Sequence, residues 1–129
     1  MQILAVRPRV PTCARAEVQP DGSLGPWIAA GTLPVGLSVT AAQQYGCQVY
    51  MLGGLTEEST DEPFSDRILR GSIGADGSFT NVTVDAAKLS IKRGHVHQTP
   101  VWKNFIYSIG GRGNEGTSLG TIDIGTFTQ

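Results

Sequence analysis

Hydrophobic residues along this chain fall into short runs that are separated by turn residues. In the run 48–52, an extended backbone places Val49 and Met51 on one side and Tyr50 and Leu52 on the other. A short, largely apolar run that closes in a glycine doublet is typical of a β-strand followed by a turn. No stretch shows the sustained i, i+3, i+4, i+7 spacing of an amphipathic helix. The pattern therefore predicts an all-β protein built from short strands.

Several of these runs occur twice, in the same order. The Asp-Gly-Ser turn at 21–23 returns at 76–78, and the aromatic run that ends in Gly-Gly occurs at 48–54 and again at 105–111. Ordered recurrence at a nearly constant offset predicts a repeated structural unit of about 55 residues. The residues that define the repeat are Asp21, Gly22, Trp27, Tyr50, Gly53, Gly54, Asp76, Gly77, Tyr107, Gly110 and Gly111.

Each unit is predicted to hold about four antiparallel strands. Residues 68–73 lead into an Asp-Gly turn and residues 82–84 leave it, which predicts a hairpin, because Asp and Gly favour tight turns. We predict a loop for residues 86–92. The nine predicted strands, enough for two four-stranded sheets and one more strand, are 13–18, 27–30, 37–43, 48–54, 68–73, 82–84, 95–101, 105–111 and 122–127.

These motifs resemble the repeat of kelch-like β-propellers. Both glycine doublets match its aromatic strand that ends in Gly-Gly, and residues 21–27 look like the Asp-Gly-Ser-Leu-Gly-x-Trp turn of bacterial and phage members. Leu33-Pro34 fits the first unit, and Arg93 with His95 or His97 fits the second. The second unit departs from the pattern with Val82 in place of Trp. The resemblance covers about residues 13–127 and implies two four-stranded blades per chain, after an N-terminal extension at 1–12.

The number of units has a consequence for assembly. Propellers close with about four to eight blades, and two blades alone would leave open sheet edges and exposed apolar faces. We therefore expect either a longer protein or a homo-oligomer, in which a trimer would give six blades and a tetramer eight. In the oligomer, strands near residues 13–31 would complete the last blade of a neighbouring copy.

Composition and charge exclude several classes of function. The net charge is −1 with only 16% charged residues, and the Lys and Arg residues are scattered, which argues against nucleic acid as a partner. No run of 18 apolar residues predicts a membrane span, and no basic region precedes the apolar patch at 3–6, so we predict no signal peptide. A cytoplasmic or virion location fits best. Cys13 and Cys47 lack metal-type spacing and are interpreted as two buried thiols or a lone disulfide.

No catalytic signature is present, and we expect neither an enzyme nor a cofactor or metal. Residues 111–116 match G-x-G-x-x-G, but the residues that follow predict a strand, and a dinucleotide site needs a helix there. His95 and His97 would share one strand face but lack a third ligand. The acidic segment 57–62 has no EF-hand spacing and is interpreted as a solvated loop. The residues left as candidates for ligand or partner binding are Arg93, His95, His97, Trp102, Glu57, Glu58 and Asp61.

Three functions remain open. The first is a structural or assembly protein that self-associates into a closed ring, for example in a phage or other surface particle. The second, implied by the resemblance, is a carbohydrate-binding propeller or sugar isomerase with its ligand at the axis near Arg93, His95, His97 and Trp102. The third is an adaptor fragment that binds a protein partner through the loop at 55–65.

Overall fold

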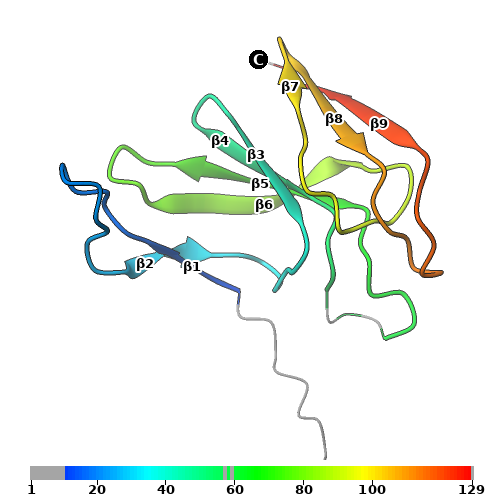
Figure 1. Cartoon of the computed structure of the whole chain (residues 1–129), viewed down its shortest axis with the longest axis horizontal. Coiled ribbons are helices and arrows are strands. Elements are labelled where there is room, and N and C mark those ends of the chain that lie inside the picture. The colour runs from blue at the N-terminus through cyan, green and yellow to red at the C-terminus, as the bar shows by residue number, and fades with distance from the viewer. Residues whose placement is uncertain (1–10, 57, 59, 129) are drawn as a thin grey trace, which may run out of the picture.

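The chain folds into three antiparallel sheets that lie one beside another (Figure 1). The computed structural model describes residues 11–56, 58 and 60–128. In this part of the chain every regular element is a strand, so the prediction of an all-β protein is confirmed. The same residues contain no helix that is long and apolar enough to cross a membrane.

The strands group into a hairpin, a complete four-stranded sheet and a three-stranded sheet. The N-terminal hairpin consists of β1 (Thr12–Arg15) and β2 (Ile28–Thr32). The middle sheet has the order β3 (Ala41–Tyr45), β4 (Gln48–Leu52), β5 (Arg67–Ile73) and β6 (Phe79–Lys88). The C-terminal sheet has the order β7 (Val101–Trp102), β8 (Phe105–Ile109) and β9 (Ile122–Thr126).

The strand order follows the sequence repeat. Strand β8 matches β4, because both lie before a glycine doublet, and β9 matches β5, because both follow the loop after that doublet. The N-terminal hairpin matches the third and fourth strands of the middle sheet, and the C-terminal sheet matches its first three. The described residues therefore contain one four-stranded sheet with a partial sheet on each side, and not the two complete sheets that were expected.

The Asp-Gly turns form as predicted, through the side-chain hydrogen bonds of aspartate and the positive φ of glycine. Gly22 and Gly77 have positive φ angles of 85° and 77°, a conformation that glycine adopts without steric cost. The Asp21 carboxylate accepts hydrogen bonds from the Ser23 amide and hydroxyl, at 2.9 and 2.7 Å. The Asp76 carboxylate accepts the corresponding amide bond from Ser78 at 3.0 Å. These hydrogen bonds to serine lower the pKa of both aspartates.

The depressed pKa values predict an acid-dependent contribution of the turns to stability. A carboxylate whose folded pKa lies below its unfolded value of about 4 stabilises the fold above that pH, and the contribution is lost as the pH falls through the folded pKa. We expect Asp21→Ala/Asp76→Ala to unfold at lower urea concentration than the parent at pH 6, with the gap shrinking as the pH falls below the unfolded pKa of about 4. A gap that stays constant from pH 6 to pH 2.5 would contradict this account.

The core lies between the middle sheet and the C-terminal sheet. Leu52, Leu89, Ile106 and Phe127 are buried together there, and Tyr45 stacks on Phe127 with ring centroids 4.0 Å apart. Leu52 comes from β4 and Ile106 from β8, whereas Leu89 directly follows β6 and Phe127 directly follows β9. The second sheet interface, between the N-terminal hairpin and the middle sheet, is held partly by Arg15, which forms an ion pair and a hydrogen bond with Asp76.

The structure corrects several local predictions. Of the strand predicted at 95–101, only Val101 is in a strand. The strand predicted at 37–43 begins at Ala41. Residues 86–88, which were predicted to form a loop, belong to β6. The interpretation of the cysteines is also wrong. Cys13 and Cys47 are both free thiols, the first partly buried, which raises its pKa, and the second exposed. Residues 1–10 of the predicted N-terminal extension lie outside the described residues.

Candidate interaction surface

The middle sheet is covered on both faces. Tyr50, Leu52 and Ile68 line a cleft against the C-terminal sheet, and Val49 and Met51 line another against the N-terminal hairpin. This alternation buries Leu52, which is only 5% exposed. A sheet covered on both faces needs apolar side chains on both, which explains the nearly continuous apolar run in β4.

The outward face of the C-terminal sheet carries apolar residues that are largely exposed. Ile109, Ile122 and Ile124 are 50%, 57% and 62% exposed. In the repeat, Ile109 corresponds to Leu52 and Ile122 corresponds to Ile68. Leu52 and Ile68 lie on the face of the middle sheet that packs against the C-terminal sheet. The C-terminal sheet therefore presents to solvent the same face that the middle sheet buries. We call this surface, made of Tyr107, Ile109, Ile122 and Ile124, the C-terminal apolar face.

A second set of exposed apolar residues lies on the N-terminal hairpin, at the opposite end of the three sheets (Figure 1). Trp27 and Val18 are the most exposed of them, at 66% and 67%. Exposed apolar residues that cluster on one face mark interaction surfaces more often than isolated ones do. The set consists of Val18, Leu24, Trp27 and Ile28.

The free edge of β9 adds unpaired backbone to the C-terminal apolar face. In the middle sheet β5 has a neighbour on each side, whereas its counterpart β9 is the last strand of its sheet. An edge strand presents amide and carbonyl groups that can pair with a further strand. Strand edge and apolar face together make this end of the molecule the candidate interaction surface.

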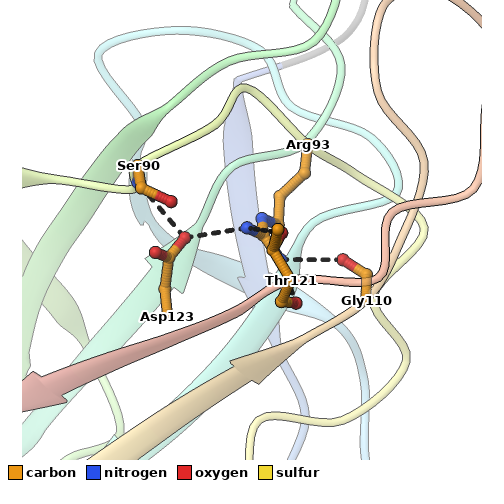
Figure 2. Close-up of polar contacts among 5 residues, drawn as sticks. All are labelled: Ser90, Arg93, Gly110, Thr121 and Asp123. Carbon is orange, nitrogen blue, oxygen red and sulfur yellow. Dashed lines mark hydrogen bonds and ion pairs between the residues drawn. The ribbon is translucent and has the colours of Figure 1, made fainter.

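Arg93, a predicted binding residue, is instead fully buried. Its guanidinium forms an ion pair with Asp123 at 2.9 Å and donates hydrogen bonds to the Gly110 carbonyl at 2.9 Å and to the Thr121 hydroxyl at 2.9 Å (Figure 2). The Asp123 carboxylate also accepts the Ser90 amide at 3.2 Å. With 0% exposure, Arg93 has no surface to offer a ligand, and its contacts join the chain before β7 to the strand β9.

The positions of Arg93 and Asp123 have counterparts in the first unit of the repeat. Val39 and His95 correspond in the repeat, and both have positive φ angles, of 50° and 54°. The same offset makes Leu37 the counterpart of Arg93. Likewise Leu69 in β5 is the counterpart of Asp123 in β9, and Leu69 is 1% exposed. At these two positions the first unit thus has two leucines, and the second has an arginine and an aspartate that form an ion pair.

The remaining candidates do not converge on one site. His95 is exposed and meets the Phe64 ring edge-on, and its positive φ ends the strand alternation that would have aligned it with His97. His97 lies on a shallow surface beside Gln43, and Trp102 is 66% exposed on β7 with the Lys103 ammonium 6.0 Å from its ring. Searched over the described residues, the structure holds no group of three or more His, Cys, Asp or Glu side chains placed to bind a metal.

The acidic loop lies beside the loop of the second unit. Glu58 forms an ion pair with Arg67 at 2.6 Å, which raises the pKa of that arginine, and Asp61 is exposed. Glu57 lies outside the described residues. The Asn114 side chain accepts the Phe64 amide at 2.7 Å and so joins the two loops. Both loops therefore lie at the same end of the sheets (Figure 1).

The G-x-G-x-x-G segment is a tight loop with no helix after it. The Gly116 amide donates to the Gly113 carbonyl at 3.0 Å, and the Arg112 side chain donates to the Gly116 carbonyl at 3.1 Å. The next regular element is β9, as predicted, so this segment lacks the helix N-terminus of a dinucleotide site.

Comparison with known protein families and with curated protein sequences finds no match to this chain.

Proposed function

We propose that this chain is a non-catalytic assembly module of the kelch-like propeller type, which associates with further blades through its terminal faces. The observation that carries the proposal is the C-terminal apolar face, whose counterpart in the middle sheet is buried. Ile109, Ile122 and Ile124 cost free energy as long as they face water, because transfer of apolar surface from water stabilises by about 25 cal/mol per Å². Association with another sheet removes that cost.

Two further observations support an assembly role. Among the described residues, a two-stranded hairpin and a three-stranded sheet flank the four-stranded sheet, and β9 is a free edge strand. The candidate residues for a glycan site are dispersed, and Arg93 is engaged in internal contacts. An assembled ring of three or four copies would have the blade number of known propellers. A particle component is the context in which such a ring fits best.

The proposal is tested by sedimentation velocity of the parent over a range of concentrations. We expect the parent to associate and Ile122→Lys/Ile124→Lys to weaken the association constant at least tenfold, about 1.4 kcal/mol, because the new charges would have to be buried at the contact. Thr117→Lys is the matched control, since Thr117 is an exposed residue of the loop before β9 and is not part of this face, and it should associate like the parent. Equal association of all three proteins would contradict the proposal.

A further inference from the structure

We propose that the occupant of the C-terminal apolar face is a second copy of this chain, whose β2 pairs with β9 and whose segment 33–38 crosses the Gly110-Gly111 doublet. This inference rests on the proposed function and specifies its partner and geometry. The interface between the middle and C-terminal sheets is the template for this contact, because several of its parts recur at the two ends of the molecule.

In the template, the segment that connects β6 to the next sheet passes directly over the first glycine doublet. The Gly54 amide donates to the Arg93 carbonyl at 2.8 Å, and the Arg93 amide donates to the Ser65 carbonyl at 3.1 Å. A Cβ atom on Gly53 would lie 2.2 Å from the Arg93 carbonyl oxygen. Only glycine allows the connecting segment to approach this closely.

The second doublet has the same form, but in the described part of the chain no connecting segment lies over Gly110 as Arg93 lies over Gly53. The Gly110 amide donates to the Thr121 carbonyl at 3.0 Å, as Gly53 does to Arg67. Among the backbone hydrogen bonds of the described residues, none involves the Gly111 amide, the counterpart of the Gly54 donor. A Cβ atom on Gly110 would meet only the Leu119 carbonyl, at 3.3 Å. A donor and a glycine-sized space therefore remain at the place where a connecting segment would lie.

The N-terminal part of the chain supplies the missing segment. The Leu33 amide donates to the Pro11 carbonyl at 2.7 Å, as the Leu89 amide does to Asp66 at 2.8 Å, so the segment after β2 starts like the one after β6. Leu37 stands at the position of Arg93, and in the described part of the chain no hydrogen bond uses its carbonyl. The Leu37 carbonyl of one copy thus matches the Gly111 amide of another.

Leu24 has the position and chemistry to fill the cleft beside β9. In the middle sheet its counterpart Phe79 lies over Gly71, where an added Cβ would be 2.5 Å from the ring. Gly125 is the counterpart of Gly71 and lines a cleft of about 230 Å³ between the middle and C-terminal sheets. Leu24 is 56% exposed in its own hairpin. Pairing of β2 with the β9 of a neighbour brings this leucine to that cleft.

Strand β9 takes the place of β1 in this arrangement. Both are third strands, so Ile122 and Ile124 match Cys13 and Arg15, which line a cleft of about 270 Å³ together with Val49 and Met51 of the middle sheet. Strand β1 has only four residues, and its pairing with β2 is shifted between Cys13 and Ala14. Strand β9 is anchored by Arg93 and by Phe127 in the core. When the β9 of a neighbouring copy replaces β1 as the partner of β2, the shorter strand β1 is released. Ile122 and Ile124 of β9 are then buried.

The two matching surfaces lie at opposite ends of the molecule (Figure 1), so the contact is head to tail. A head-to-tail contact closes into a ring when the rotation between copies allows it. Each copy then contributes its middle sheet and its C-terminal sheet, the latter completed by the β2 of its neighbour. This gives two complete four-stranded sheets per chain.

The test is directed disulfide formation between different copies. The middle sheet pairs Arg70 with Thr83, and their counterparts are Ile124 and Ile28. Facing residues of an antiparallel pair are close enough for a disulfide. In a Cys13→Ser/Cys47→Ser background, one batch carries Ile28→Cys and the other Ile124→Cys. We expect the mixed batches to give a dimer on a non-reducing gel at least ten times more abundant than either batch alone.

Ser118→Cys, on an exposed loop, replaces Ile124→Cys in the control mixture and should not cross-link with Ile28→Cys. A dimer from Ile124→Cys alone would show face-to-face contact and overturn the head-to-tail arrangement. No cross-link from a protein that still sediments as an oligomer would overturn the β2–β9 pairing while the assembly function stands. A protein that sediments as a monomer and does not cross-link would refute both.

Discussion

We expect Arg93→Leu to lose about 3–5 kcal/mol of unfolding free energy, because it leaves the Asp123 carboxylate partly buried without its cation. Asp123 is about one-fifth exposed, and its carboxylate also accepts a hydrogen bond from the Ser90 amide. The Gly110 and Thr121 carbonyls lose their guanidinium donor as well. Urea unfolding followed by intrinsic fluorescence measures the loss.

The matched control is Arg93→Leu/Asp123→Leu, which recreates the two leucines that the first unit has at positions 37 and 69. Replacement of a buried ion pair by apolar residues of similar volume is often neutral or stabilising. We therefore expect the double variant to recover most of the stability that the single variant loses. A double variant as unstable as Arg93→Leu would show that Arg93 stabilises through something other than its partner charge.

The second large effect is expected at the first glycine doublet. Gly53 has a φ of 63°, and an added Cβ would lie 2.2 Å from the Arg93 carbonyl oxygen and 3.1 Å from that of Ser65. Gly53→Ala therefore suffers both the left-handed backbone conformation, about 1–2 kcal/mol for a non-glycine residue, and the displacement of a connecting segment. We expect a loss at least twice as large as the conformational cost alone.

Gly110→Ala is its counterpart in the second unit and isolates the conformational cost. Gly110 has a φ of 65°, but in the described part of the chain no connecting segment lies over it, so a methyl group meets only the Leu119 carbonyl. At low protein concentration Gly110→Ala should lose about 1–2 kcal/mol. Under the head-to-tail arrangement it should also weaken association. Equal losses for the two glycine variants would contradict the role given to the connecting segment.

The sequence predicted the strands and turns whose signals are local. Alternation and the glycine doublets located β4 and β8, and Asp-Gly located the turn between β5 and β6, because each depends on neighbouring residues only. The strand at 95–101 was predicted wrongly because its small and apolar residues fit a strand. In the structure His95 has a positive φ and its amide donates to the carbonyl of Val39, which lies before β3 and not in a strand.

The candidate site could be predicted only in part. Arg93 was predicted to be a binding residue because nothing near it in the sequence identifies its partner, Asp123, which lies 30 residues away. The apolar character of Ile122 and Ile124 was visible in the sequence, but their exposure was not, because burial depends on which sheet lies opposite. The repeat was a signal that could have revealed it, because Ile109 occupies the position of Leu52, which the C-terminal sheet covers, and among the described residues no sheet covers Ile109 in the same way.

The central claim, that these sheets assemble with further copies through their terminal faces, is tested most directly by the native mass of the parent protein. Multi-angle light scattering over a hundredfold range of concentration should give a mass that rises from that of the 13.7 kDa chain to a plateau at three or four times this value. A mass of 13.7 kDa at every concentration, from a protein that unfolds cooperatively, would contradict the account.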